Sequence, residues 1–359
     1  MQKEYREPPF ASKDVFEAAP DFVAIHAGAN PNDANPVAAE LVEERFGLSD
    51  VAAVYGQMAG IARGQRLEGY RAVSAAISSA DFQQALADGL RRAILQRVQA
   101  TDTHRRVCHV IRVPDFKSVL ISKLDVDTEL PELRENGEMK TVRLQATDGK
   151  VLGQVKTYAA ALRISREIVI NDDVGLLRRI ANQMAVSAIR REAEGVYGIL
   201  ADNPDLPDGD PMFAGSNSLD GIALDAAGLG QALAYLRTQT DRFEKPADNQ
   251  AAHLIVAPDL EYAAHKLVAD ITTQTNRPAL RVVSAPWVPA GRWYLQADPE
   301  DAPTIGFLSI EAPGERNINP VTVSRRKLPP EADGIGLHVM SDFGTVAMSR
   351  LGIVRGGGE

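Results

Sequence analysis

The segment of residues 171–203 has the pattern of one long helix, and this constrains the fold more than any other feature. Its apolar side chains recur at three- and four-residue steps, as on one face of a helix: Val174, Leu177, Ala181, Met184 and Ala188. Asn171 is placed to cap the first amide groups, and Asn203 precedes a proline, where helical geometry is disfavoured. At roughly 1.5 Å per residue, such a helix is about 45 Å long. This length suits a broad, thin domain, and the core of an enzyme equally well.

The composition is that of an ordinary globular protein. The chain has 359 residues, of which 45% are hydrophobic and 24% charged, and its length suggests about two domains. The net charge of −9, without clustered Lys and Arg, argues against strong binding to nucleic acid. The one cysteine excludes an internal disulfide and indicates a reducing cytosol. No secretory signal or membrane-spanning segment is expected, because no apolar stretch is long enough.

Before the long helix, the pattern predicts an arm, helices and then a hairpin. Residues 1–36 are rich in Pro, Asn, Asp and Glu, which predicts an extended arm. Residues 37–77 predict short helices, and a firmer helix is expected over residues 79–100. Residues 116–165 alternate as strands do, with tight turns expected at Asn136–Gly137 and at Asp148–Gly149. A hairpin of this length is marginal alone, so it packs on the rest of the chain or on a neighbouring molecule.

After the long helix, the pattern predicts a compact α+β unit. Helices are expected over residues 225–240 and 259–271, and short strands at HLIVAP, LRVVSAP, RWYLQA and TIGFLSI. Two longer strands follow, on either side of PPEADG, and the final residues GGGE are expected to be a frayed tail.

The sequence contains no convincing catalytic or cofactor motif. It has no HExxH, CxxC, EF-hand or phosphate-binding loop, so no cofactor or metal is expected. Cys108, flanked by His104 and His109, does not match a common metal-ligand spacing, and a simple cluster at a strand edge is the better interpretation. Ser341, Asp342 and His338 alternate along one strand and do not converge as a catalytic triad does. This favours a structural or interaction protein over an enzyme.

Several segments, taken in order, resemble the major capsid proteins of tailed bacteriophages with the Hong Kong 97-type fold. They are VPDFK, ENGEMK, TYAAALRISREIVINDD, DNPDLPDGDPMFAG, HLIVAPDLEYAA, WYLQADPEDAPTI and SDFGTVAM, which together span about residues 79–355. The resemblance is greatest to the capsid part of prohead protease–capsid fusion proteins. Only residues 1–78 precede the similar region, too few for a protease domain, so either a separate prohead protease is expected or the chain is a mature product. The histidine-containing loop of relatives is missing from DPMFAGSNSLDG, so no role is transferred to that loop.

The resemblance implies an α+β capsid fold divided into named regions. These are an N-terminal arm with short helices (1–78), the first helix and strand of a P-domain (79–116), an E-loop (117–158), the P-domain with its spine helix 171–203 (159–224), an A-domain (225–309), P-domain strands (310–340), and a C-terminal strand and tail (341–359).

The implied function is that of a major capsid protein, not an enzyme. Hexamers and pentamers of the chain would build an icosahedral shell that encloses double-stranded DNA without sequence-specific binding, in the virion and without a membrane. The expected partners are a portal, a prohead protease, and scaffold or decoration proteins, with assembly in the bacterial cytoplasm. Candidate contacts between subunits are charged residues of the E-loop and of the spine helix, together with one glycine at the expected turn: Lys117, Lys123, Glu132, Arg134, Glu135, Gly137, Glu138, Lys140, Arg178, Arg179, Arg190 and Arg191. The alternatives are an encapsulin-like nanocompartment and a soluble enzyme.

Overall fold

The computed structural model describes most of the chain as two compact units. The described residues are 8–58, 76, 79–101, 103–126, 144–165, 167–168, 171, 174–240, 244–275, 280–310, 321–326 and 335–358. Unit 1 comprises Met1–Asp102, Thr157–Arg190 and Asn319–Asp342. Unit 2 comprises Thr103–Lys156, Arg191–Ile318 and Phe343–Glu359. Helix α7 and strand β11 supply residues to both units.

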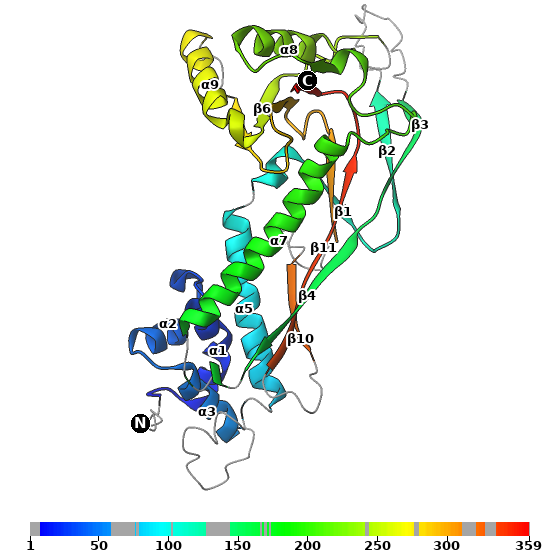
Figure 1. The fold of residues 1–359 in the computed structure, drawn as a ribbon. Coiled ribbons are helices and arrows are strands. Elements are labelled where there is room, and N and C mark those ends of the chain that lie inside the picture. Colours follow the sequence, from blue (N-terminus) through cyan, green and yellow to red (C-terminus); the bar gives the residue numbers. More distant parts are fainter. Residues whose placement is uncertain are drawn as a thin grey trace, which may run out of the picture. The chain divides into compact units, whose positions relative to one another are not determined.

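Unit 1 is mainly helical. Its helices are α1 (Ser12–His26), η1 (Pro31–Asp33), α2 (Pro36–Glu43), α3 (Leu48–Met58), α5 (Ala80–Ala100) and the first part of α7 (Val174–Asp202). Helix α1 contacts α2, α3 and α5, and Figure 1 shows α1, α2 and α3 gathered beside one end of α5. The Ser79 hydroxyl caps α5 by accepting a hydrogen bond from the Phe82 amide at 3.3 Å. The helices predicted over residues 79–100 and 171–203 are therefore observed, with ends that differ by a few residues.

Helix α1 contradicts the expectation of an extended arm over residues 1–36. Its buried residues follow helical spacing and belong to the main core of unit 1: Val15, Ala18, Ala19, Phe22 and Val23. The polar and proline-rich flanks hid this apolar face, and Pro20 lies inside the helix. Residues 1–7 lie outside the described part of the chain, so the arm expectation is wrong for the segment that the structure describes.

The contacts around Pro20 explain why the helix tolerates it. Proline has no amide hydrogen, so the Phe16 carbonyl one turn earlier loses its usual donor. The Tyr55 hydroxyl of α3 donates to that carbonyl at 2.9 Å, and the Tyr55 ring stacks on the Phe16 ring with centroids 4.5 Å apart. Helix α5 approaches at Gly89, where an added Cβ would lie 2.5 Å from the Pro20 carbonyl oxygen. Side chains outside α1 thus offset the cost of its proline.

Three strands complete unit 1. Strand β10 (Val321–Arg326) pairs antiparallel with the first half of β11 (Ile335–Ala347), and β4 (Lys156–Ile164) also pairs with β11. The Thr157 hydroxyl and the Asp342 carboxylate form a hydrogen bond at 2.6 Å. The buried face of α7, including Leu177 and Ala181, shares one core with Val321 and Leu337 of these strands.

Unit 2 contains a five-stranded sheet with the order β5-β12-β8-β6-β7. The strands are β5 (Ser218–Asp220), β6 (Ala251–Val256), β7 (Arg281–Ser284), β8 (Arg292–Ala297) and β12 (Ile353–Gly357), preceded by the short helix η3 (Gly215–Asn217). Helix α8 (Ala226–Thr238) contacts β8 and β12, whereas η4 (Pro258–Leu260) and α9 (Glu261–Thr275) lie at the end of β6, with α9 in contact with β7 (Figure 1). The core of this part includes Leu229, Leu254, Trp293 and Val354. The predicted helices and the strands at HLIVAP, LRVVSAP and RWYLQA are thus observed together, whereas TIGFLSI forms β9 (Ile305–Ile310) in a different sheet.

The other strands of unit 2 follow the short helix η2 (His104–Val107). Strand β1 (His109–Val113) runs parallel to β9 (Ile305–Ile310), and β9 pairs antiparallel with residues 343–347 of β11. Strands β2 (Val119–Val126) and β3 (Leu144–Gly153) form a separate pair. No described helix is both long and apolar enough to cross a lipid bilayer.

Strand β12 contradicts the expectation of a frayed glycine tail. Gly356 and Gly357 lie inside β12, which pairs with β5 on one side and β8 on the other. The Trp293 ring packs so closely on Gly356 that an added Cβ would lie 2.2 Å from ring atom Cε2. The glycines therefore make room for a buried tryptophan, a role that glycine often has inside a strand.

Replacing Gly356 with alanine is expected to lower the free energy of unfolding by about 1–3 kcal/mol, because the methyl group forces Trp293 out of its position. Gly230→Ala in α8 is the matched control, since an added Cβ there meets no atom within 4 Å. That change is expected to stabilise by up to about 1 kcal/mol through helix propensity. Urea unfolding of both variants measures the difference, and equal midpoints would contradict the packing of Trp293 on Gly356.

Candidate assembly surfaces

Strands β2 and β3 form a two-stranded sheet of their own. The strands pair antiparallel from Val119–Gly153 to Val126–Leu144, and no other described strand joins them. Figure 1 shows them as an extended two-stranded ribbon. Each strand therefore has an outer edge whose backbone groups pair with no other described strand, which is a template for contact with another chain. An isolated ribbon is marginal in water, so an external partner would stabilise it.

One of the two turns predicted in this hairpin is wrong. Gly149 lies within β3, and the pairing shifts between Ser122–Lys150 and Leu124–Ala146. Residues 147–149 thus oppose a single residue of β2, as in a β-bulge. The conformational freedom of Asp-Gly that suggested a turn also suits a bulge, and strand pairing selects the bulge. The other predicted turn, at Asn136–Gly137, lies outside the described residues.

The structure describes only two of the eight candidate contact residues in the E-loop. Lys117 is exposed and forms an ion pair with Asp115 at 3.4 Å. Lys123 lies at the bulge of β2. The others lie outside the described part of the chain: Glu132, Arg134, Glu135, Gly137, Glu138 and Lys140.

The base of the ribbon is held firmly within unit 2. Val113, Val155 and Leu308 form a small buried cluster against which Val119 packs. The Gln154 carbonyl oxygen lies against the backbone of Gly344 in β11, where an added Cβ would come within 2.3 Å of it. The ribbon thus has a fixed base and two outer edges that pair with no other described strand.

The four arginines proposed as contacts on α7 are all exposed, but they do not form one patch. Arg179 and Arg190 are eleven positions apart, about three helical turns, so they lie on one face. Arg178 and Arg191 lie on other faces, and Arg191 forms an ion pair with Glu194 at 2.5 Å. Arg179 and Arg190 are therefore brought into line by the helix, whereas the other two are not.

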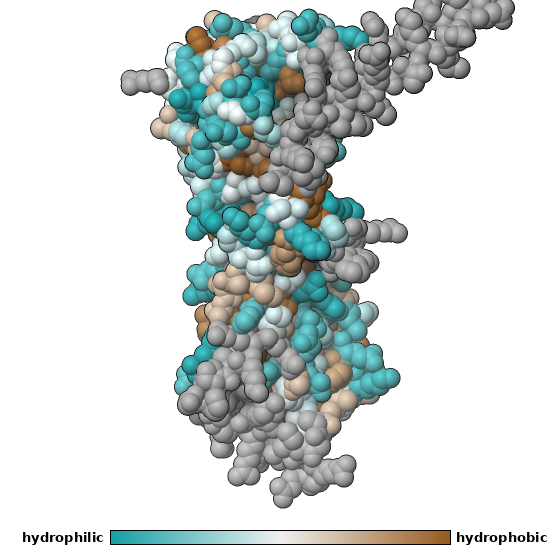
Figure 2. Space-filling view, turned by 90° about the vertical axis from the view of Figure 1, so that its right-hand side faces the viewer, coloured by the Kyte–Doolittle hydropathy of each residue, from teal (hydrophilic) through white to brown (hydrophobic). Residues whose placement is uncertain are grey.

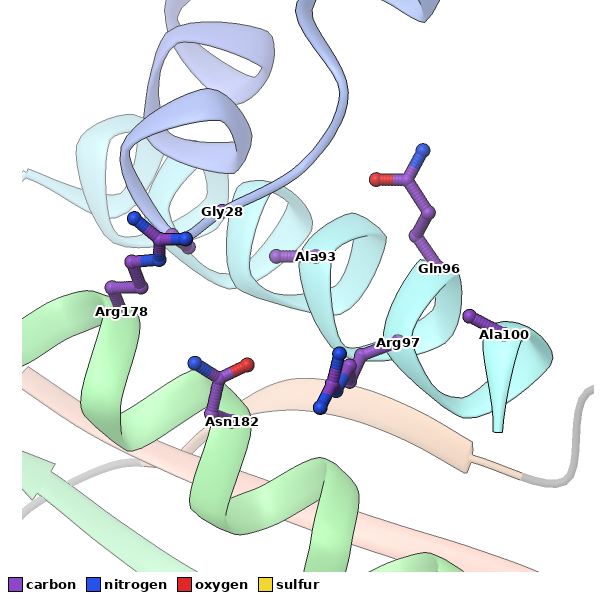
Figure 3. A pocket seen from close by; sticks show the side chains of 8 residues that line it. Gly28, Ala93, Gln96, Arg97, Ala100, Arg178 and Asn182 are labelled. Carbon is purple, nitrogen blue, oxygen red and sulfur yellow. The ribbon is translucent and has the colours of Figure 1, made fainter. Parts of the chain in front are cut away.

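Arg178 belongs to a basic pocket in unit 1. The pocket has a volume of about 380 Å³, and its polar lining residues are Gln96, Arg97, Arg178 and Asn182. Figure 3 shows that Gln96 and Arg97 come from α5, whereas Arg178 and Asn182 come from α7. No carboxylate lines it, and both arginines lie at the surface. The pocket is suited to a carboxylate supplied by another molecule.

Glu192 follows the exposed Arg190 and Arg191 along α7 but, unlike them, is buried. Its side chain has an exposed fraction of 0% and accepts hydrogen bonds from His104 Nε2 at 2.9 Å and Arg105 Nη2 at 2.8 Å. Burial alone would raise the pKa of Glu192, but hydrogen bonds from His104 and Arg105 and their charges outweigh it, so the pKa lies below its usual 4.5. This cluster fixes η2 to α7.

The side chains of Cys108 and His104 have partners within the protein. His104 is engaged with Glu192, and the Cys108 thiol donates to the His104 carbonyl oxygen at 3.3 Å. Among the described residues, no three ligand-type side chains converge as a metal would require.

Two exposed aromatic residues were not found by sequence reasoning. The exposed fraction is 83% for Tyr262, at the start of α9, and 49% for Phe116, just before the ribbon. Nothing in their local pattern distinguishes them from buried aromatics. Figure 2 shows hydrophobic and hydrophilic side chains interspersed over the face in view. Exposed aromatics are enriched in protein interfaces, so both join the candidate contacts.

Comparison with known proteins assigns the family. The sequence profile of the phage capsid protein family matches residues 148–356, more than half of the chain and parts of both units. The chain belongs to the phage capsid protein family. No curated protein matches the sequence.

Solved structures with a similar fold include capsids and encapsulins. The holo-encapsulin complex of Synechococcus elongatus is 13% identical, with 74% of this chain and 88% of that chain covered and a TM-score of 0.46. A structure from Mycobacterium phage Patience is 14% identical, with 76% of this chain and 87% of that chain covered and a TM-score of 0.43. The capsid of Myoviridae phage XM1 is 13% identical, with 69% of this chain and 90% of that chain covered and a TM-score of 0.40. Because these identities and TM-scores are low, the assignment of the chain to the phage capsid protein family rests on the sequence profile.

Proposed function

We propose that the chain is the major capsid protein of a tailed phage. Hexamers and pentamers of it would build an icosahedral shell around double-stranded DNA, assembled in the bacterial cytoplasm. The observation that carries the proposal is the family match over residues 148–356, which includes the long helix and nearly all of the sheet β5-β12-β8-β6-β7. The net charge of −9 suits a container that holds DNA by enclosure and does not bind it tightly. The role is structural and not catalytic.

In this proposal the ribbon of one subunit lies on the next. The outer edges of its strands carry backbone N–H and C=O groups that pair with no other described strand, and its base is anchored by Val113, Val155 and Leu308. The segment between its strands is rich in carboxylates: DVDTELPELREN. The pocket beside Arg97 and Arg178, and the face of α7 with Arg179 and Arg190, offer opposite charge. Complementary charges of this kind favour correct register and association rate more than raw affinity.

The regional names of the capsid fold follow from the same proposal. Helix α7 would be the spine of the P-domain, β2 and β3 the E-loop, and the sheet with α8 and α9 the A-domain. The likeness to prohead protease–capsid fusions supports a separate protease partner, together with a portal and scaffold or decoration proteins.

An encapsulin-like nanocompartment is the alternative, since it would use the same kind of assembly with different contents. Purified particles from the native host separate the two. Packaged double-stranded DNA of uniform length supports the phage capsid, whereas an enclosed enzyme without DNA supports the nanocompartment.

Deleting residues 125–140, the end of β2 and the segment after it, is expected to leave a folded subunit that does not form closed shells. The base of the ribbon, including Val119 and Val155, is untouched, so the core of unit 2 should be preserved. Negative-stain electron microscopy measures shells, and circular dichroism checks folding. Normal shells from the folded variant would contradict the role of the ribbon in assembly.

A further inference from the structure

A buried histidine in unit 2 has an unusual environment. His253 of β6 has an exposed fraction of 3%, yet neither ring nitrogen has a hydrogen-bond partner among the described residues. Buried polar groups are nearly always hydrogen-bonded, so an exception calls for a physical reason. Sequence analysis gave His253 no role beyond a position in a short buried strand.

The backbone around His253 is also irregular. The pairing of β6 with β8 shifts between Ala251 and His253, which leaves Ala252 as an extra residue in β6. Such bulges redirect the neighbouring side chain and are frequent beside functional sites. On the other side of β6, His253 is in register with Arg281 of the edge strand β7. Residues in register point to the same face of a sheet, so the two side chains share one face.

His253 is one of the residues that line a surface pocket with a volume of about 520 Å³. Thr103 and Arg106 line it from the region of η2, Glu261 from the first turn of α9, and Arg281 and Ser284 from β7. Arg106 and Arg281 are exposed, whereas His253 is buried. The pocket is therefore lined by two guanidinium groups, two hydroxyl groups, one carboxylate and a buried imidazole.

The charges around the ring define the ligand chemistry. Burial lowers the pKa of His253, the Asp298 carboxylate opposes this effect, and Arg281 and Arg106 add to it. The ring is therefore neutral near pH 7 and has one donor and one acceptor nitrogen. Guanidinium groups match the geometry of phosphate and sulfate and bind them with strong, charge-assisted hydrogen bonds.

We propose that this pocket binds a phosphate or sulfate group, held by the exposed guanidinium groups of Arg106 and Arg281 beside the buried His253 ring. The volume is within the range of small-molecule sites and exceeds that of one inorganic anion. A phosphate carried on a small organic molecule thus fits as well as the free anion. The inference does not depend on shell assembly, because every residue of the pocket lies in unit 2 of one chain.

Isothermal titration calorimetry of the full chain with sodium sulfate, in phosphate-free buffer at constant ionic strength, tests the proposal. Saturable binding is expected for the wild type, with affinity at least tenfold lower in Arg281→Gln. Lys266→Gln is the matched control, because Lys266 is an exposed cation of α9 that does not line the pocket, and its affinity should be unchanged. Absence of saturable binding to the wild type, or equal losses in both variants, would overturn the proposal.

Glycerol 3-phosphate in the same titration distinguishes the two sources of the anionic group. Affinity equal to that of sulfate supports a free anion, and tighter binding that still needs Arg281 supports a phosphorylated small molecule.

The pH dependence of sulfate binding supplies a second readout. In the free protein the pKa of His253 lies below its usual 6.5. A bound anion offsets the two guanidinium charges and raises this pKa, so affinity should rise as pH falls below 6.5. The other charged groups that act on the ring or line the pocket are Arg106, Arg281, Asp298 and Glu261. His253→Gln keeps a donor but should abolish the dependence. A wild-type affinity independent of pH would contradict an anion beside His253.

Discussion

Replacing Glu192 with alanine is expected to lower the free energy of unfolding by about 3–5 kcal/mol, because it removes one partner of a buried charge cluster. The exposed fraction of the side chain is 0% for Glu192, 1% for His104 and 9% for Arg105, so the remaining arginine charge stays in a poorly solvated position. The Arg105 guanidinium also lies 5.2 Å from the centroid of the Phe307 ring, which limits its escape to water. Chemical denaturation of the subunit under conditions that prevent assembly measures the loss.

Glu194→Ala is the matched control for this prediction, since it removes the same group two residues along α7. Glu194 pairs with Arg191 at the surface, where both side chains are about half exposed. The expected loss is below about 1 kcal/mol. Similar losses for the two variants would contradict the buried cluster.

The pH dependence of stability provides an independent check on Glu192. Its pKa in the folded protein lies below the ordinary value of 4.5, so the folded state favours the ionised carboxylate. This contribution is present above the unfolded pKa and is lost as pH falls through the folded pKa. The stability advantage of the wild type over Glu192→Gln should therefore shrink as pH falls below 4.5. An advantage that stays constant would contradict the sign of the shift.

Replacing Phe22 with alanine is expected to cost about 3–5 kcal/mol of stability, the usual effect of emptying a buried aromatic site. Phe22 is fully buried on α1 and belongs to the main core of unit 1. If residues 12–26 were instead a dispensable arm, the substitution would have little effect. Phe116→Ala makes the same chemical change at a half-exposed position and should cost about 1 kcal/mol or less. The difference between their urea midpoints decides whether α1 is part of the core.

The elements that sequence analysis predicted well are those whose own pattern determines their structure. Helix α7 has a regular apolar stripe and ends before a proline, and the strands β6, β8 and β9 are short apolar runs between turn residues. In each case the local periodicity and the tertiary fold favour the same structure.

The errors occurred where distant residues decide the outcome. Pro20 suggested an arm, but the Tyr55 hydroxyl, 39 residues away, satisfies the carbonyl that the proline leaves without a donor. Glu192 follows two arginines and looks exposed, yet its partners lie 87 and 88 residues away. Gly356 looked like part of a flexible tail. A glycine is needed there because the Trp293 side chain, on another strand, occupies the space that a Cβ would fill. The local sequence records none of these contacts.

Sedimentation velocity combined with electron microscopy of the purified wild-type protein tests the central proposal most directly. The chain has a mass of 38.7 kDa, and a shell of hexamers and pentamers would sediment as one species many times heavier. We expect closed, uniform particles with icosahedral outlines. A monomer or small oligomer that persists across concentrations, with no closed particles in the images, would contradict a shell-forming protein.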